Sequence, residues 1–379
     1  MKPPGREFLA ADPRCKKSCL CGILAVASLL CAILLFTSSF FAERYNQKLS
    51  RWRVNFQNLG IDKCKNQCRP TGSQALPEGI VSNTSNLEMR PLWVRIDLET
   101  FEQIKANASA NLFAMAVGIT QKDLVNKMVK KFLASDFVVM LFHYDGIVDG
   151  WKDFEWSNHV IHVSAINQSK WWFAKRFLHP DIVAEYDYIF LWDEDLGVEN
   201  FHPDKYVSII KSEGLEISQP ALDRDKSEMH HQITVRQRRS QVHRRIYKPR
   251  GSGKGCDESS TAPPCTGWVE MMAPVFSRDS WRCVWYLIQN DLIHAWGLDM
   301  QLGYCAQGDR TKNVGVVDAE YIVHYGHPTL GGIDETEGSS HAKDHRVDVR
   351  RRSYHELEVF RKRWQKAVEE DECWVDPFQ

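Results

Sequence analysis

The chain has 379 residues, with 48 Lys or Arg against 49 Asp or Glu, so its formal net charge is −1. This length predicts one large domain or two small ones, with ample apolar residues for a core. Because the charge is balanced, the chain as a whole carries no field of the kind that draws a protein to nucleic acid, and we expect no nucleic-acid partner.

Residues 19–42 form an uncharged stretch rich in Leu, Ile, Ala and Phe, which is long enough to cross a bilayer of about 30 Å. It exceeds a typical signal-peptide apolar region, and no small-x-small cleavage site follows it. A core helix that is apolar on every side is the alternative. Basic residues flank the stretch on both sides, but the short tail favours a single-pass type II anchor with residues 1–18 in the cytosol.

Residues 43–92 are punctuated by Pro and Gly and rich in Ser, Thr and Asn, which predicts a stem without regular structure. Three N-glycosylation sequons, at Asn83, Asn107 and Asn167, agree with a lumenal location for the chain beyond the anchor. In such an oxidising compartment, closely spaced cysteines form disulfides. The local candidates are Cys64 with Cys68 and Cys256 with Cys265.

From residue 111 to residue 222, apolar strand-like runs alternate with segments of helical period. This alternation predicts βαβ units and a parallel sheet with right-handed crossovers. The expected strands are 112–117, 137–142, 160–163, 188–192 and 215–222, and the expected helices are 122–133, 171–178 and 203–212.

The sequence YDYIFLWDEDLGV at residues 186–198 is the centre of this pattern, because a buried strand leads directly into Asp193, Glu194 and Asp195. Crowded carboxylates repel one another unless a cation lies between them, and Mg²⁺ or Mn²⁺ carrying substrate phosphates fits such a site. A solvated acidic turn is the alternative. The triplet lies at the carboxyl end of a strand, where open α/β sheets bind ligands, and this placement favours the metal site.

The next segment, residues 224–262, is basic and ends in a Gly-rich run. One interpretation of this segment is a nucleic-acid-binding patch, but such a patch has no obvious target in a lumen. The segment could instead be a solvated flap, or its cations could contact a diphosphate near the metal. Beyond it we expect strands at 267–276 and 314–324 and helices at 278–288 and 300–305. An amphipathic helix at 354–368 is expected to pack on the core through Leu357, Phe360, Trp364 and Val368.

An anchored chain with a stem and an Asp-x-Asp at the end of a central strand resembles Golgi glycosyltransferases of the GT-A fold, over about residues 110–330. More specifically, the segments LWDEDLGVENFHPDKY, PPCTGWVEMMAPVFSRDSWRC and WGLDMQLGYCAQGD resemble a plant family of unknown function catalogued as lysine-ketoglutarate-reductase trans-splicing related. A lumenal anchored protein is a poor candidate for RNA splicing, so that name contributes little to the functional prediction.

The glycosyltransferase resemblance implies roles for particular residues. Asp195 would coordinate Mn²⁺ or Mg²⁺ on the phosphates of a nucleotide sugar, and Asp193 would meet the ribose or a metal-bound water. His324 or His327 would add a further metal ligand, where the alternative is an ordinary hydrogen-bonded histidine.

Two further positions complete the implied site. Asp299 resembles the general base of inverting members, although it would also serve as a helix N-cap before Met300. Glu270 is the second choice for the base. Trp268 and Trp296 could stack on sugar rings or simply fill the core.

The sequence therefore predicts an α/β fold, a GT-A-like (Rossmann-like) mixed sheet flanked by helices behind an N-terminal transmembrane helix. The predicted organisation is a cytosolic tail (1–18), an anchor (19–42), a stem (43–92), the glycosyltransferase-like domain (93–338) and a C-terminal helical segment (339–379). The predicted function is metal-dependent transfer of a sugar from a nucleotide-sugar donor to a glycan or glycoconjugate acceptor in the Golgi lumen. A non-catalytic lumenal scaffold with a degenerate nucleotide-sugar-binding fold is the alternative.

Overall fold

The structure, a computed structural model, describes residues 64, 69–85, 111–249, 255–327 and 345–378. Arg69–Gln379 forms one compact unit. Within the described ranges no helix is both long and apolar enough to cross a membrane. The predicted anchor at 19–42 lies outside the described residues, as do the sequon at Asn107 and most of the predicted stem.

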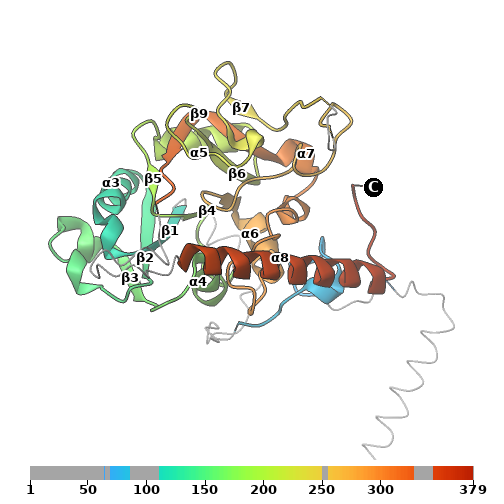
Figure 1. Ribbon diagram of the computed structural model, residues 1–379, viewed down its shortest axis with the longest axis horizontal. Coiled ribbons are helices and arrows are strands. Elements are labelled where there is room, and N and C mark those ends of the chain that lie inside the picture. The colour runs from blue at the N-terminus through green and yellow to red at the C-terminus, as the bar shows by residue number, and fades with distance from the viewer. Residues whose placement is uncertain (1–63, 65–68, 86–110, 250–254, 328–344, 379) are drawn as a thin grey trace, which may run out of the picture. The chain divides into compact units, whose positions relative to one another are not determined.

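In the described part of the chain, nine strands form one mixed sheet (Figure 1). Along the sheet the order is β3 (Ile161–Ser164), β2 (Phe137–His143), β1 (Asn111–Val117), β4 (Tyr188–Trp192), β8 (Val275–Ser277), β6 (Ile217–Leu222), β9 (Val314–His324) and β5 (Leu196–Gly197), with β7 (Val242–His243) also paired to β9. The pairs β1–β2, β1–β4, β2–β3 and β6–β9 are parallel. Strand β8 is antiparallel to both of its neighbours. The sheet is mixed, and the predicted α/β class is confirmed.

Helices cover both faces of the sheet. On one face, α3 (Lys122–Leu133) and α5 (Pro203–Ser212) pack in one core cluster with alternate residues of β1, such as Phe113 and Met115. On the other face, α4 (Lys170–Phe177) and α6 (Arg278–Leu287) pack with the intervening β1 residues Leu112 and Ala114. Because successive side chains of a strand point to opposite faces, a strand buried on both sides is apolar throughout, and this is why β1 has no polar alternation.

Local sequence explains the buried face of one helix and the starts of two others. Helix α3 buries Val125, Met128, Val129 and Phe132, which lie on one face at helical spacing. Helix α5 has Pro203 in its first turn, where the missing N–H costs nothing. The hydroxyl of Ser277 caps α6 by accepting a hydrogen bond from the backbone N–H of Ser280.

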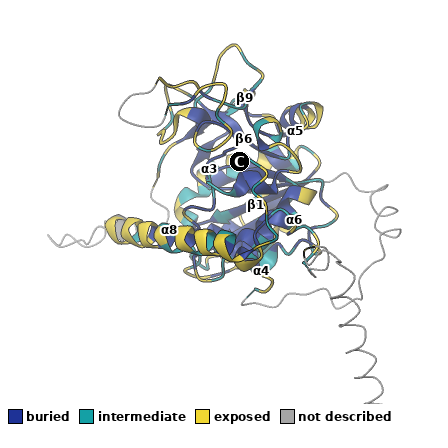
Figure 2. Cartoon of the chain, turned by 90° about the vertical axis from the view of Figure 1, so that its right-hand side faces the viewer, coloured by how far each residue is buried: buried dark blue, intermediate teal, exposed yellow. Residues whose placement is uncertain are grey.

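The last helix, α8 (His345–Glu370), lies along the side of the sheet that carries α4 and α6 (Figure 1). Its inner face is buried and its outer face is exposed (Figure 2). Phe360 belongs to the core cluster of that side and Trp364 packs against it, as expected. Leu357 and Val368 are only half-buried, and Ala367 lies in the core cluster instead. The helix begins at His345, whereas the sequence predicted a start at residue 354.

Residues 69–85, which the sequence assigns to the stem, also contribute to this core. Leu76 and Ile80 are buried in it, and the short helix η2 (Glu78–Ile80) contacts α8. Arg69 lies 2.5 Å from the carboxylate of Asp371, just beyond the end of α8. The segment has little regular structure, as expected from its Pro and Gly content, yet it is packed rather than extended.

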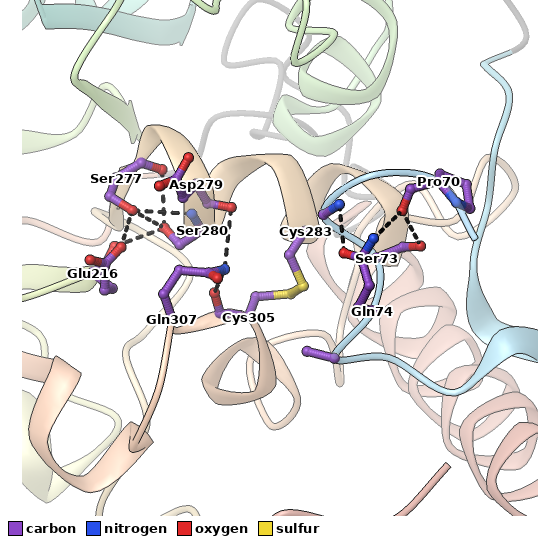
Figure 3. Close-up of a disulfide and its surroundings, with 12 residues drawn as sticks. Pro70, Ser73, Gln74, Glu216, Ser277, Asp279, Ser280, Cys283, Cys305 and Gln307 are labelled. Atoms are coloured by element: carbon purple, nitrogen blue, oxygen red, sulfur yellow. Dashed lines mark hydrogen bonds between the residues drawn. A yellow bond between two sulfur atoms is a disulfide. The ribbon is translucent and has the colours of Figure 1, made fainter. Parts of the chain in front are cut away.

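Several described cysteines are disulfide-bonded: Cys64, Cys256, Cys265, Cys283, Cys305 and Cys373. Cys256 pairs with Cys265, as predicted from their spacing. Cys283 in α6 pairs with Cys305 at the end of η7 (Leu302–Cys305), a pairing that the sequence did not indicate. Figure 3 shows this second disulfide at the base of α6, between the Ser277 cap and the Pro70–Ser73 turn. The other predicted pair, Cys64 with Cys68, includes a residue outside the described ranges.

The prediction of a strand at 267–276 is wrong over most of that range, because only Val275–Ser277 is a strand. Residues before it run irregularly beside β4, where the carbonyls of Met272 and Pro274 accept hydrogen bonds from the N–H groups of Asp193 and Leu191. Pro274 has no N–H to continue a ladder.

Candidate active site

The topology brings the carboxyl ends of several strands to one edge of the sheet. Strands β4 and β2 both run parallel to β1. Strand β8 is antiparallel to both β4 and β6, so β6 and its parallel neighbour β9 run in the same direction as β4. Gly118, Tyr144, Asp193, Asp223 and His324 therefore lie at or just beyond the same edge, where open α/β sheets bind ligands.

The three carboxylates of the triplet have three different partners. An oxygen of Asp193 lies 2.7 Å from the ammonium nitrogen of Lys170. Glu194 turns inward to the ends of β1 and β2, and Asp195 faces His324 at the end of β9. The three adjacent carboxylates are thus separated from one another, which relieves the repulsion expected from the sequence.

Glu194 is structural. Its Oε2 accepts a hydrogen bond from the backbone N–H of Gly118 at 2.6 Å, and its Oε1 accepts one from the phenol of Tyr144. Only 1% of its surface is exposed. Burial raises the pKa of Glu194 to about 8. The middle residue of the triplet therefore joins the ends of three strands.

Lys170, the first residue of α4, is buried and makes three contacts. Besides Asp193, its ammonium group donates hydrogen bonds to the carbonyl oxygens of Met271 at 2.5 Å and Met272 at 3.3 Å. A buried ammonium needs such partners to offset its lost hydration. Lys170 thus fixes Asp193 and the irregular segment before β8 in one arrangement.

Asp195 and His324 form the closest match to a metal-binding pair. Asp195 Oδ2 lies 3.4 Å from His324 Nε2, and both residues are mostly buried. His324 Nδ1 lies 2.9 Å from the carbonyl oxygen of Glu228, and its backbone N–H donates to the hydroxyl of Ser227 at 3.1 Å. Metal-binding histidines characteristically donate their second ring N–H to such a carbonyl. The other ring nitrogen of His324, Nε2, faces Asp195 in this structure.

The charge balance of this pair follows from its geometry. Burial alone lowers the pKa of His324, but the hydrogen bond and negative charge of Asp195 raise it to about 9. Among the described side chains, no group of three or more His, Cys, Asp or Glu residues has a geometry that could hold a metal ion. The chain therefore brings together two potential ligands, and a bound ion would take its other ligands from phosphates or water.

Two more carboxylates, Glu270 and Asp299, lie near each other, and Glu270 also lies near His324. Asp299 accepts hydrogen bonds from the indole N–H of Trp268 at 3.2 Å and from the backbone N–H of Met300 at 3.0 Å. Burial raises the pKa of Asp299. Glu270 is 9% exposed, and its Oε2 has no hydrogen-bond partner among the described residues.

Burial raises the pKa of Glu270 to about 7, with the charges of His324, Asp299 and Asp193 acting on it as well. Carboxylates from three separate segments, at Asp193, Glu270 and Asp299, therefore lie in one region with His324. A recess that holds several carboxylates against one histidine is suited to bind cations and to accept protons.

The two tryptophans differ in placement. Trp268 is 2% exposed, and its ring lies 4.5 Å from the ring of His231 in an edge contact. It supports Asp299 through its N–H. Trp296 is 38% exposed and packs edge-on against Tyr354 of α8, on a different part of the surface.

His327, the other predicted metal ligand, is exposed. Its ring stacks on Tyr325 and its Nδ1 lies 3.1 Å from the side-chain oxygen of Gln121. No contact of His327 with Asp193 or Asp195 is present within the described ranges. Of the two histidines, the structure brings His324 to the triplet.

The sequence did not indicate Lys170, Tyr144 or Glu228 as parts of this site. Of the three, Lys170 was the easiest to predict, because a lysine beside Trp171 and Trp172 lies in an apolar helix, where a charge requires a partner. The contacts of Tyr144 and Glu228 depend on how distant strands pair, and no local pattern reports that.

Solved structures to which the chain is similar include TarS residues 1–349 from S. aureus, at 6% identity and a TM-score of 0.36, covering 56% of this chain and 59% of that chain. Another is the Mycobacterium tuberculosis glucosyl-3-phosphoglycerate synthase in complex with Mn²⁺, UDP-glucose and phosphoglyceric acid, at 12% identity, TM-score 0.35, and 74% and 86% coverage. The glycosyltransferase GlyE of Streptococcus pneumoniae TIGR4 is similar at 12% identity, TM-score 0.32, and 70% and 66% coverage.

The chain thus spans about three fifths of the TarS segment that it matches. At these identities and TM-scores, the likeness assigns neither an activity nor a ligand. A comparison with curated proteins gives no match. A family model matches residues 67–370, which is most of the chain and nearly all of the compact unit. The chain belongs to the family described as protein of unknown function DUF707.

Proposed function

We propose that this protein is a metal-dependent glycosyltransferase that moves a sugar from a nucleotide-sugar donor to a glycan or glycoconjugate acceptor. The observation that carries the proposal is the 3.4 Å approach of Asp195 and His324, which are distant in sequence and are brought together where β5 pairs with β9 at the ligand-binding edge of the sheet. Glu270 and Asp299 add the acid–base capacity that sugar transfer requires.

The donor set fits Mn²⁺ or Mg²⁺. Asp195 and His324 would hold the ion, with Asp193 at its edge and held in place by Lys170. Carboxylate oxygen is the preferred ligand of both ions, and an imidazole favours Mn²⁺ over Mg²⁺. When bound, the ion supplies positive charge that stabilises a departing nucleoside diphosphate.

Asp299 is proposed as the general base. The acceptor hydroxyl oxygen forms a bond to the anomeric carbon, the bond from that carbon to the phosphate oxygen breaks, and its electron pair leaves with the nucleoside diphosphate. The hydroxyl proton passes to the Asp299 carboxylate, which the Trp268 indole and the Met300 N–H hold in position. Glu270, with an unpartnered buried oxygen, is the second candidate for this proton.

The proposed setting is the Golgi membrane, with a single-pass type II anchor at residues 19–42 and the catalytic unit in the lumen. The disulfides Cys256–Cys265 and Cys283–Cys305 support an oxidising compartment. The competing proposal is a non-catalytic lumenal scaffold, and the burial of Glu270 without a partner speaks against it. A scaffold has no need of a carboxylate whose desolvation costs free energy.

A donor-hydrolysis assay on the full chain tests the proposal. UDP- and GDP-sugars are incubated with the protein and Mn²⁺, and release of the nucleoside diphosphate is followed. We expect release from one nucleotide class, reduced by about 100-fold or more in Asp299→Asn. Asp136→Asn, an exposed residue at the opposite edge of the sheet, is the matched control and should retain full activity.

If Glu270→Gln abolishes release while Asp299→Asn does not, the base assignment moves to Glu270. If no donor is turned over by a folded protein that also fails to bind nucleotide, the scaffold is the better account.

A further inference from the structure

The arginines of the basic segment have different structural roles. Arg244 forms an ion pair with Glu213 at 2.9 Å, and Arg245 donates to the carbonyls of Asp257 and Glu258, so these two hold the fold together. The others line a cavity of about 500 Å³ between β6 and β7, formed by Arg224, Arg236, Gln237, Arg238 and Arg239. Four of its five lining residues are arginines, and none is acidic.

Three of the four guanidinium groups of this cavity, those of Arg224, Arg238 and Arg239, are available to a ligand. Arg224 and Arg239 are exposed and have no carboxylate partner within the described part of the chain. Arg238 pairs with Asp225 at 3.3 Å, but both side chains are more than 70% exposed, so this pair contributes little and is easily exchanged. Arg236 is fixed, because its Nε donates to the carbonyl of Asp318 and its guanidinium stacks at 3.6 Å on the ring of Tyr321.

A second cavity of about 490 Å³ adjoins the first and shares Arg224 and Gln237 with it. Its wall includes Met229 and Tyr247, which are 38% and 61% exposed. An exposed aromatic ring next to guanidinium groups combines a flat apolar surface with anion-binding donors. The volumes of the two cavities lie in the range of small-ligand sites, about 300–1,000 Å³.

These cavities are joined to the candidate active site by one segment. Residues 224–236 leave the carboxyl end of β6 and return to it, where the Arg236 N–H donates to the Leu222 carbonyl. Between those points, Ser227 and Glu228 hold His324 in place. The arginine cavity therefore lies on the segment that orients the proposed metal ligand, beside β9 rather than beside β1 and β2.

We propose that the two cavities form one subsite for an acidic saccharide, the acceptor, with its anionic groups on Arg224, Arg238 and Arg239 and a sugar ring on Tyr247. As an acceptor site this rests on the proposed function, but the binding itself does not require it. Arginine presents a planar fork that matches carboxylate oxygens in pairs. The lining lacks the carboxylates and histidines that a metal-bound diphosphate would need, which favours an acceptor over the donor.

Isothermal titration of the full chain, without metal or nucleotide, tests this subsite. The probe is a tetramer of galacturonic acid, compared with a neutral galactose tetramer and with UDP. We expect the acidic tetramer to bind at least about tenfold more tightly than the neutral one. Arg224→Gln with Arg239→Gln should remove about tenfold of that affinity, and lysine at both positions should restore part of it by keeping the charge.

The control replaces two exposed cations elsewhere, Lys205 of α5 and Arg350 of α8, by Gln, and it should leave the affinity unchanged. Equal affinity for the acidic and neutral tetramers, or an equal loss in the control variant, would overturn the subsite. Metal-free UDP binding that the arginine substitutions abolish would assign the cavity to the donor instead. Because no turnover is measured, failure of the subsite remains distinct from failure of the transferase proposal.

Discussion

The ammonium nitrogen of Lys170 lies 2.7 Å from a carboxylate oxygen of Asp193 and also donates to two carbonyls of the segment that precedes β8. One buried side chain thus joins the start of α4, the end of β4 and the irregular segment at residues 271–272. This contact holds the first carboxylate of the triplet against the start of α4.

Lys170→Met should destabilise the protein, because the substitution leaves two carbonyls and one carboxylate without their donor. We expect the free energy of unfolding to fall by about 1–3 kcal/mol, discounted from a fully buried pair because Asp193 is 38% exposed. Urea denaturation followed by circular dichroism measures the change. Lys205→Met on the exposed face of α5 is the control, and equal midpoints for the two variants would contradict the role of Lys170.

Tyr144→Phe removes the phenol that donates to buried Glu194. The carboxylate then keeps only its bond from the Gly118 N–H, and the free energy of unfolding should fall by about 1–3 kcal/mol. Tyr354→Phe, at an exposed position of α8, should change it by less than about 0.5 kcal/mol. A thermal shift that is the same for both variants would show that Glu194 does not depend on Tyr144.

His143 predicts a pH dependence of stability away from the proposed metal site. Burial, with a contribution from His162 at 2.8 Å, lowers its pKa to about 4, although the charge of Asp145 opposes the shift. The unfolded chain titrates near about 6.5, so below that pH the unfolded state takes up a proton that the folded state refuses. Stability from this residue is complete above pH 6.5 and is lost as the pH falls toward 4.

The expected loss is on the order of 1–3 kcal/mol over that window. Urea midpoints at pH 7 and pH 5, compared between the unsubstituted chain and His143→Gln, measure it. The difference between the two pH values should shrink in the variant. An unchanged difference would mean that His143 is protonated in the folded state or that another group dominates.

The Cys283–Cys305 disulfide closes a loop of 22 residues, whereas Cys256–Cys265 closes one of 9. A longer closed loop restricts the unfolded chain more, so removal of the first should cost more, within a typical range of about 2–4 kcal/mol. The double alanine variants of each pair are compared by chemical denaturation. A larger loss for the shorter loop would show that native packing, rather than loop closure, sets the order.

Much of the fold follows from local pattern. The apolar runs at β1 and β4 and the helical spacing of Met128 and Phe132 in α3 predict burial from neighbouring residues alone. Leu124, which the same spacing placed on the buried face, is only half-buried, and Val125 is buried instead. The same reasoning failed at 267–274, where an apolar run looks like a strand. The bond from Lys170 to Met271 and the proline at residue 274 decide that geometry, and the first of these is a contact between distant segments.

The site was predictable in part for the same reason. Carboxylates after a buried strand identify the edge, so Asp193 and Asp195 could be chosen from sequence. Their partners could not, because the selection of His324 over His327 depends on how β9 lies beside β6 and on the bond from His324 to Glu228. The arginine cavity likewise could not be predicted, because the sequence does not show which arginines are already bonded to other parts of the fold.

The most direct test of the central claim is a calorimetric titration of the full chain with UDP and GDP, with and without Mn²⁺. The account predicts that one nucleotide binds only when Mn²⁺ is present, and that Asp195→Asn and His324→Gln each weaken this binding by about tenfold or more, while Asp136→Asn does not. Binding that is independent of the metal, or that survives both substitutions, would contradict the assignment of Asp195 and His324 as the metal-binding pair.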